Sequence, residues 1–162
     1  MKRFQLIALI TLAFVVTGCG FQLRGTTNLP EAFTQLQLIN DGLNDDQFRQ
    51  LSNMLVKAGA TLQSSDGNDS VQLKVKIVSL LERNLVDRAN TGKTIVQVSK
   101  RLSYSVKKSD DVTPLQIKII ERQINIEQDS NNLLGTGSEK KAAERTLDQA
   151  LFSQLVFQLK RL

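Results

Sequence analysis

Few side chains in this sequence could carry covalent or acid–base chemistry. The chain of 162 residues contains one cysteine, Cys19, and no histidine. Without histidine, the hydroxyl–imidazole and thiol–imidazole pairs that activate many protein nucleophiles are excluded. The carboxylates of Asp45-Asp46 and of Asp110-Asp111 are chain neighbours whose side chains diverge, so neither pair predicts an acid–base dyad, and no metal-ligand spacing occurs. The sequence therefore predicts a protein that is not an enzyme and needs no metal or cofactor.

Cys19 follows a segment that has the organisation of a secretory signal. Lys2 and Arg3 give this segment a basic start, residues 6–16 form a short apolar core, and small residues precede the cysteine. The apolar core is too short to cross a bilayer as a helix, which takes roughly 20 residues. Val16-Thr17-Gly18-Cys19 resembles the lipobox of bacterial lipoproteins, in which an aliphatic residue and two small residues precede a cysteine. The resemblance implies cleavage before Cys19 and acylation of that residue.

Acylation of Cys19 would attach the mature chain to a membrane. Two acyl chains suffice for stable attachment, at about 0.8 kcal/mol for each buried methylene. The next residue is Gly20 and not aspartate, so the inner-membrane retention signal of enterobacterial lipoproteins is missing. We therefore expect a lipid anchor in the outer membrane, with the protein facing the periplasm. A free cysteine buried behind a cleaved signal is the alternative interpretation.

The net charge narrows the range of partners only slightly. The formal charge is +5, and removal of Lys2 and Arg3 with the signal lowers it from +5 to +3. A moderate basic excess favours anionic partners such as phosphorylated lipid headgroups or acidic protein surfaces, but it also suits a solvated surface. Nucleic acid is not an expected partner of a lipid-anchored protein outside the cytoplasm.

The hydrophobic periodicity predicts a strand, a helix, three strands and a second helix. Asn44 and Gln47 form a capping-box pattern before the first helix, and Gly59 suits its C-terminal stop. Ser138 is expected to cap the second helix after a loop at residues 129–137, and residues 61–70 are expected to form another loop. The expected elements are residues 36–40, 45–58, 71–85, 94–107, 115–128 and 139–162.

Three features of the strands depart from simple alternation. The apolar pattern changes phase near Val78 in the second expected strand. Lys100 interrupts the apolar face of the third strand, whose opposite face carries serine and other polar residues. In the fourth strand the apolar parity shifts between Ile119 and Ile120, as a β-bulge would produce.

The element order predicts how the layers pack. Strands joined by short turns are antiparallel neighbours, and two amphipathic helices both need an apolar sheet face. The prediction is an α+β two-layer sandwich, a four-stranded mixed sheet with two helices on one face, in the order β-α-β-β-β-α. The expected division is a signal at 1–18, a lipidated tether at 19–30 and a single domain at 31–162. The other sheet face, with its lysine and serine rows, is either solvated or a contact surface.

The expected start of the mature chain resembles a known family. Cys19-Gly20-Phe21-Gln22-Leu23-Arg24-Gly25, followed by Thr26-Thr27-Asn28-Leu29-Pro30, is similar to the opening of the LPS-assembly lipoproteins of the outer-membrane lipopolysaccharide translocon. That family begins with cysteine, glycine, an aromatic residue, a variable position and leucine-arginine, and a proline follows shortly before the first strand. It often has histidine where this chain has Gln22. Beyond this opening, the agreement is one of element order.

The resemblance implies a function in lipopolysaccharide (LPS) export. Proteins of this family form a complex with the LPS-exporting β-barrel, plug its lumen, assist its assembly and help deliver LPS to the outer leaflet. Basic residues near the turn between the second and third strands, and near the start of the last helix, are implicated in LPS contact. Arg88 matches the first position, whereas Thr136 stands at the second and two lysines follow about a turn later. The candidate LPS contacts are Arg88, Lys93, Lys140 and Lys141.

Two observations bear on these candidates and on the alternatives. The two lysines of the last helix fall in its expected first turn, where the helix dipole disfavours cations, so a cost to stability there favours a functional role. A solvated surface role is the alternative for each of the four. An accessory of another envelope machine, for barrel insertion or lipoprotein delivery, is the alternative function, followed by a purely structural envelope lipoprotein. Too few aromatic residues are present to favour a lipid carrier with a deep apolar cavity.

Overall fold

A computed structural model describes residues 28–63, 70–88, 92–108, 116–129 and 132–162. The predicted signal, the lipobox with Cys19 and the predicted tether up to residue 27 lie outside these ranges. The described elements, in chain order, are the 3₁₀ turn η1 (Glu31–Phe33), β1 (Gln35–Asn40), α2 (Asp45–Lys57), β2 (Thr61–Leu62), β3 (Val71–Arg88), β4 (Lys93–Lys107), β5 (Ile117–Asp129) and α3 (Leu133–Leu159).

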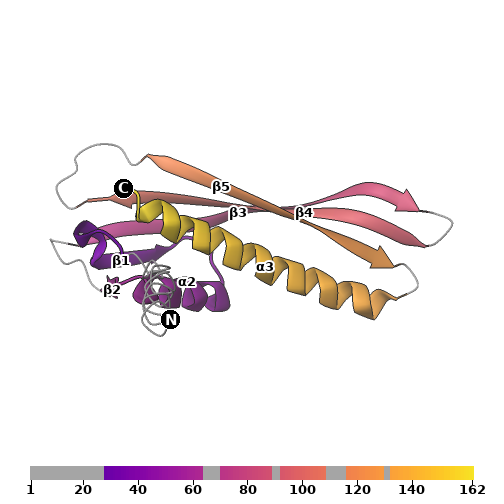
Figure 1. The fold of residues 1–162 in the computed structure, drawn as a ribbon, viewed down its shortest axis with the longest axis horizontal. Helices are drawn as coiled ribbons and strands as arrows, with labels where there is room; N and C mark the ends of the chain where they lie inside the picture. The colour runs from indigo at the N-terminus through magenta and orange to yellow at the C-terminus, as the bar shows by residue number, and fades with distance from the viewer. Residues whose placement is uncertain (1–27, 64–69, 89–91, 109–115, 130–131) are drawn as a thin grey trace, which may run out of the picture.

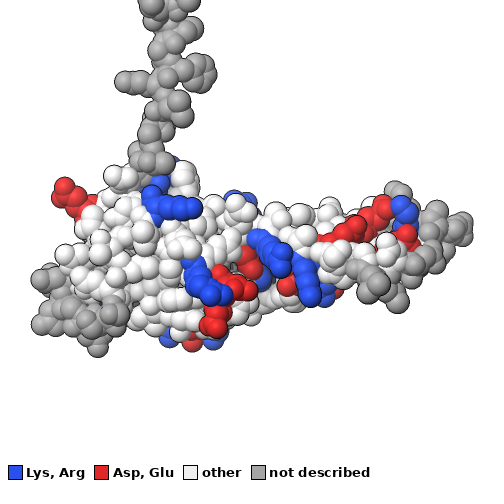
Figure 2. Space-filling view, turned by 90° about the horizontal axis from the view of Figure 1, so that it is seen from below, with Lys and Arg blue, Asp and Glu red and all other residues white. Residues whose placement is uncertain are grey.

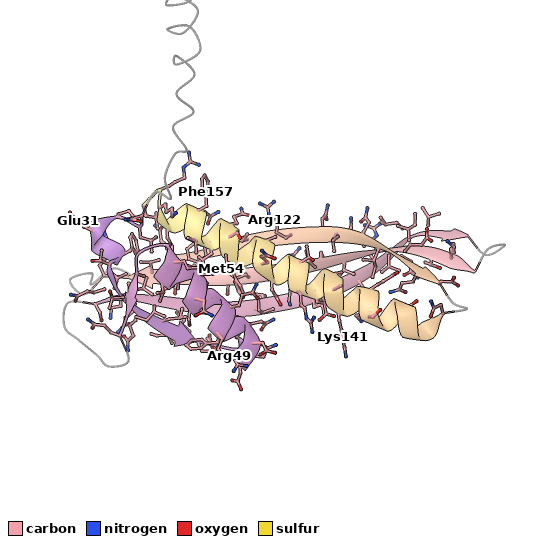
Figure 3. All side chains as sticks on the ribbon, turned by 60° about the horizontal axis from the view of Figure 1, so that its bottom comes forward. Glu31, Arg49, Met54, Arg122, Lys141 and Phe157 are labelled. Carbon is pink, nitrogen blue, oxygen red and sulfur yellow. The ribbon has the colours of Figure 1, made fainter. Side chains whose placement is uncertain are left out.

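These elements form a mixed sheet with both helices on one face (Figures 1 and 3). The strand order is β2-β1-β3-β4-β5, with β1 parallel to β2 and β3, and with β3, β4 and β5 antiparallel to one another. This confirms the predicted α+β class and the order β-α-β-β-β-α. The sheet has five strands and not four, because Thr61 and Leu62, predicted to lie in a loop, pair with the start of β1. The Thr61 amide donates to the carbonyl of Thr34 at 2.6 Å.

Local hydrogen bonds fix both ends of α2. The Asn44 side chain accepts from the Gln47 amide at 2.9 Å, and the Gln47 side chain accepts from the Asn44 amide at 3.1 Å, which is the predicted capping box. Gly59 has a φ of +96°, a left-handed conformation that only glycine adopts readily. From there the amides of Gly59 and Ala60 donate back to carbonyls of the last turn. The predicted stop at Gly59 is confirmed.

The long strand β3 carries two irregularities in its pairing with β4. The register shifts between Ile77 and Ser79, which confirms the predicted change of phase near Val78, and shifts again between Asn84 and Val86. Each shift leaves an extra residue on β3, and such bulges increase the local twist.

The bulge predicted in β5 is wrong. β4 and β5 pair without any register shift over their whole length. Ile120 is buried on the helix side, whereas Ile117 and Ile119 are 71% and 64% exposed on the opposite side. The change of apolar parity therefore marks isoleucines that face away from the helices, and not a bend in the strand.

The second helix begins earlier than predicted. α3 starts at Leu133, and the Asn132 side chain caps it by accepting from the Gly135 amide at 2.9 Å. Ser138, the predicted cap, lies within the helix, where its hydroxyl donates to the Gly135 carbonyl at 2.8 Å. Glycine costs about 1 kcal/mol in a helix interior, which is why the sequence pattern favoured a loop here.

The buried apolar residues form two separate clusters. The proximal core lies at the end of the sheet where β1, β2 and α2 are placed, as Figure 1 shows for these elements, and the distal core lies between β4 and the middle of α3, at Leu147. Leu29, from the predicted tether, is buried in the proximal core. Fully buried members of the proximal core include Leu36, Leu51, Leu55, Leu73, Val75, Leu102, Leu151, Phe152, Leu155 and Leu159. The distal core consists of Val96, Val98 and Leu147, with Ile124 and Ile126 partly buried against them.

Lys100, the residue that interrupts the apolar face of β4, lies between the two cores. Its ammonium is 2.6 Å from a carboxylate oxygen of Asp148 on α3, and the two side chains are only 6% and 9% exposed. The other oxygen of Asp148 accepts from the side-chain amide of Gln47 at 3.0 Å. Gln47, the partner of Asn44 in the capping box of α2, thus also binds the buried ion pair that joins β4 to α3.

Candidate binding surface

The sheet face turned away from the helices, here called the outer face, is mostly polar. Along β4 the even-numbered residues from Val96 to Tyr104 are buried, so the odd-numbered residues lie on the outer face. This confirms the predicted polar face of β4, which consists of Gln97, Ser99, Arg101, Ser103 and Ser105. On the neighbouring strand β5, Glu121 binds Arg101 at 2.8 Å.

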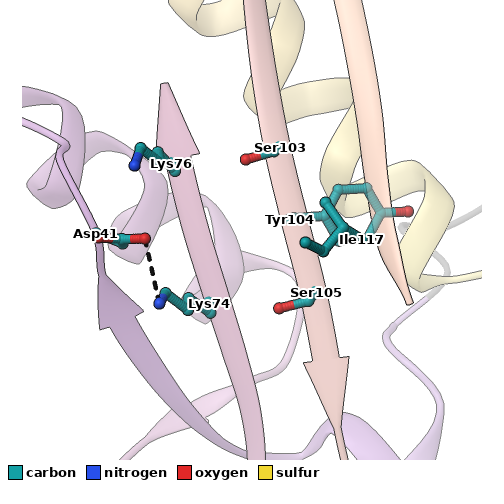
Figure 4. A pocket seen from close by; sticks show the side chains of 7 residues that line it. All are labelled: Asp41, Lys74, Lys76, Ser103, Tyr104, Ser105 and Ile117. Carbon is teal, nitrogen blue, oxygen red and sulfur yellow. Dashed lines mark ion pairs between the residues drawn. The ribbon is translucent and has the colours of Figure 1, made fainter. Parts of the chain in front are cut away.

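A hollow of about 280 Å³ lies on this face at the proximal end of the sheet (Figure 4). We call it the basic hollow; its lining residues are Asp41, Lys74, Lys76, Ser103, Tyr104, Ser105 and Ile117. The register of β3 and β4 sets Lys74 opposite Ser105 and Lys76 opposite Ser103. Two ammonium groups and two hydroxyls therefore share one small area of the outer face.

Part of this hollow is predictable from the sequence. The alternation of Lys74 and Lys76 with apolar residues predicted a basic face on this strand. The placement of Ser103, Ser105 and Ile117 beside those lysines depends on strand order and register, which alternation alone does not give.

Two of the predicted LPS contacts, Arg88 and Lys93, lie at the distal end. They are register partners at the ends of β3 and β4, before and after the turn. Gly92 in that turn has a φ of +67°, consistent with the predicted hairpin. The Lys93 ammonium forms an ion pair with Glu127 at 2.6 Å, and both side chains are half exposed.

The other two predicted contacts, Lys140 and Lys141, lie beyond the first turn of α3, because the helix begins at Leu133. The expected dipole penalty therefore does not apply to them. Lys140 binds Glu82 of β3, and its pKa is raised by the hydrogen bond that its ammonium donates to this carboxylate and then by the carboxylate's charge. Lys141 is exposed (Figure 3).

The structure does not bring the four predicted residues into one site. Glu82, which binds Lys140, is the register partner of Val98 and so lies on the helix side, whereas Lys93 has the outer-face parity of β4. Figure 2 shows basic and acidic side chains interspersed over the middle of the molecule on the side seen from below. The face seen in that view carries charges of both signs.

Two further properties of the described residues bear on function. Within the residues that the structure describes, no three acidic side chains gather closely enough to hold a metal ion. Helices in the same part of the chain also lack the combined length and apolarity that crossing a membrane requires.

No protein-family model and no curated protein matches this chain. Solved structures do match it. A minor lipoprotein from Acinetobacter baumannii has a TM-score of 0.59 at 18% identity, over 82% of this chain and 94% of the other. The rare lipoprotein B from Shewanella oneidensis has a TM-score of 0.57 at 16% identity, over 78% and 91%. This chain shares the fold of rare lipoprotein B. A lipoprotein B from Nitrosomonas europaea agrees, with a TM-score of 0.56 at 16% identity, over 87% and 90%. At these identities the similarity to rare lipoprotein B concerns the fold.

Proposed function

We propose that this protein is an outer-membrane lipoprotein that forms a complex with the LPS-translocon β-barrel, plugs its lumen, assists its assembly and helps deliver LPS to the outer leaflet. The observation that carries the proposal is the fold shared with the rare lipoprotein B from Shewanella oneidensis. The opening from Val16 to Arg24 supports it separately, because the resemblance there is one of sequence and not of fold. No catalytic role is assigned.

The outer face has the chemistry that a plug needs. The lumen of a large outer-membrane barrel is polar, so a protein inside it has to present polar side chains. The serines of β4 and the Arg101–Glu121 ion pair supply such a surface along the middle of the sheet. In our proposal this face meets the lumen, while acylated Cys19 holds the protein at the membrane and raises its effective concentration near the barrel.

Arg88, Lys93, Lys140 and Lys141 remain the proposed LPS contacts at the distal end. Lys93 and Lys140 already bind carboxylates, so an LPS phosphate has to displace Glu127 or Glu82 to reach them. Phosphate binds ammonium groups by charge-assisted hydrogen bonds, which are shorter and stronger than neutral ones. Unchanged LPS binding by the purified protein after all four are changed to glutamine would exclude this set as contacts.

The test of the proposed function is recovery of the complex from native outer membranes. The tagged, acylated protein is extracted in detergent and captured, and its partners are identified by mass spectrometry. We expect near-stoichiometric recovery of the LPS-translocon barrel. The Cys19→Ala variant, which has no acylation site, serves as the matched control and is expected to recover less barrel.

The alternative functions give different results in the same experiment. Stoichiometric recovery of a barrel-insertion or lipoprotein-delivery machine would make the protein an accessory of that machine. Recovery of no partner would favour a purely structural envelope lipoprotein. Either result overturns the proposed function.

A further inference from the structure

The basic hollow presents cationic and hydroxyl groups that are only partly engaged within the protein. Lys74 forms an exposed ion pair with Asp41 at 3.2 Å. Lys76 has no ion pair within the part of the chain that the structure describes, and no described group hydrogen-bonds the hydroxyl of Ser103 or Ser105. In Figure 4 both hydroxyls point from β4 towards the lysine side of the hollow.

These groups together fit a phosphate. Two ammonium groups and two hydroxyls offer several donors to tetrahedral oxygens, and directly opposed strand residues have Cβ atoms about 5 Å apart, close enough for one ligand to reach both. Asp41 opposes an anion, but it is exposed and its single charge leaves the hollow net positive. A phosphomonoester carries a charge of about −1.5 to −2 near neutral pH, so it competes well with one carboxylate for Lys74.

An apolar surface adjoins the phosphate-binding groups. On β5, Ile117 lies opposite Ser105 and Ile119 lies opposite Ser103. These two isoleucines are the most exposed of the large aliphatic residues in the described part of the chain, at 71% and 64%. The lysines of β3, the serines of β4 and the isoleucines of β5 therefore lie side by side on the same sheet face. This arrangement suits an amphiphile with an anionic headgroup.

We propose that the basic hollow binds the phosphomonoester headgroup of a lipid, and that Ile117 and Ile119 take the start of its acyl chain. The hollow of about 280 Å³ takes the headgroup, and the chain lies on the open surface of β5, where both isoleucines are exposed. This site is at the opposite end of the sheet from Arg88 and Lys93. It does not require a barrel partner, so failure of this proposal and failure of the proposed function are separate results.

The test is a titration of the full-length acylated protein, purified in a neutral detergent, with three small probes. Dihexanoyl phosphatidic acid has both the phosphomonoester and the acyl chains, inorganic phosphate has only the anion, and dihexanoyl phosphatidylcholine has the same chains on a zwitterionic head. Backbone amide NMR shifts report both the affinity and the place of binding. We expect phosphatidic acid to bind at least about tenfold more tightly than either other probe, with shifts at Lys76, Ser103 and Ser105.

Matched variants locate the site. Lys76→Gln is expected to weaken phosphatidic acid binding by about fivefold, and Ile119→Ser is expected to weaken it without changing phosphate binding. Lys118→Gln is the control, because Lys118 is an exposed lysine on β5 with the opposite parity to Ile117 and Ile119, and it is expected to have no effect.

Three results would overturn the proposal. Equal affinity for phosphatidic acid and phosphatidylcholine would mean that the headgroup is not recognised. Equal affinity for phosphatidic acid and inorganic phosphate would mean that the isoleucines do not take an acyl chain. Equal losses of affinity for phosphatidic acid in Lys76→Gln and Lys118→Gln would mean that binding reflects the net charge of the protein and not this hollow.

Discussion

The two ends of the sheet are built very differently. At the proximal end, β1, β3, β4, α2 and the C-terminal half of α3 enclose a large apolar core. At the distal end, three strands and one stretch of helix enclose three buried residues, Val96, Val98 and Leu147. Several large aliphatic residues of β3 remain exposed in the middle and distal part of the strand. They are Val78, Leu80, Leu81, Leu85 and Val86.

This difference predicts an uneven distribution of stability. Free energies of local opening follow the number of buried apolar contacts, so the distal end is expected to open before the proximal end. The Lys100–Asp148 ion pair lies at the boundary, since Val98 and Leu147 belong to the distal core whereas Leu102 and Leu151 belong to the proximal one. The pair therefore separates two apolar clusters that would otherwise be continuous along β4 and α3.

The largest expected effect is at this boundary. Lys100→Met leaves the buried carboxylate of Asp148 without its cation, and we expect a loss of about 3–5 kcal/mol in the free energy of unfolding, measured with urea. The double variant Lys100→Met with Asp148→Leu removes both charges and is expected to regain most of that loss. Arg101→Met, at the exposed neighbouring position, is the control and is expected to cost less than about 1 kcal/mol. A double variant no more stable than Lys100→Met would contradict the boundary interpretation.

Two leucines on α3 compare the cores directly. Leu151 in the proximal core is fully buried and Leu147 in the distal core is 2% exposed, so truncation to alanine removes the same atoms at both sites. We expect Leu151→Ala to lower the free energy of unfolding by about 3–5 kcal/mol and Leu147→Ala to lower it by about 2 kcal/mol, since the thinner distal layer relaxes more easily around a void. Hydrogen exchange in Leu147→Ala is expected to accelerate in β4 and β5 around Val96 and Ile126 only. Equal costs at both sites would show that the ends are equally well packed.

A smaller, pH-dependent effect is expected at Tyr104 in the proximal core. Its hydroxyl donates to the side chain of Gln158 at 2.5 Å, and burial raises its pKa. Because the folded pKa is the higher one, the stabilisation is fully present below the usual pKa near 10 and is lost as the pH rises through the folded pKa. Tyr104→Phe is expected to cost about 1 kcal/mol at neutral pH. Urea titrations of both proteins should show this difference shrinking above about pH 10, and a constant difference would count against the assignment.

The smallest expected effect is at the distal end. Lys140→Gln removes the half-exposed ion pair between α3 and Glu82, and we expect a loss below about 1 kcal/mol that diminishes further in high salt. Lys141→Gln is the control on the same helix. A loss at Lys140 as large as that at Leu147 would mean that the distal end depends on this ion pair more than on its apolar core.

Local chemistry explains what the sequence could predict. The capping box at Asn44, the glycine stop at Gly59 and the change of phase near Val78 each depend on a few neighbouring residues, and all three are confirmed. The α+β class and the element order follow from periodicity in the same way. The interruption of the β4 face by Lys100 was also visible in the sequence, but its partner Asp148 was not, because that pairing is fixed by how α3 lies on the sheet.

The wrong predictions depend on contacts between elements. The sequence predicts too late a start for α3 because Gly135 and Gly137 weaken the helical pattern. In the structure the Thr136 hydroxyl donates to the Asp129 carbonyl at 3.1 Å and joins the first turn to the end of β5. The two-residue strand β2 exists only because β1 lies beside it. Prediction of the basic hollow requires the strand register, which the sequence pattern does not give. The parity of Ile117 and Ile119 suggests a bulge because nothing in the sequence marks an apolar residue as outward-facing.

The buried ion pair also determines where α3 sits along the sheet. The apolar stripe of α3 repeats every four residues through Leu147, Leu151, Leu155 and Leu159, so displacement by one turn would again set leucines against the sheet. Such a displacement would move Asp148 by about 5 Å and leave Lys100 buried without its counter-charge. The leucine repeat alone does not distinguish the two positions, whereas the charged contact does. The ion pair between Lys100 and Asp148 therefore favours one position of α3 along the sheet over the positions one turn away.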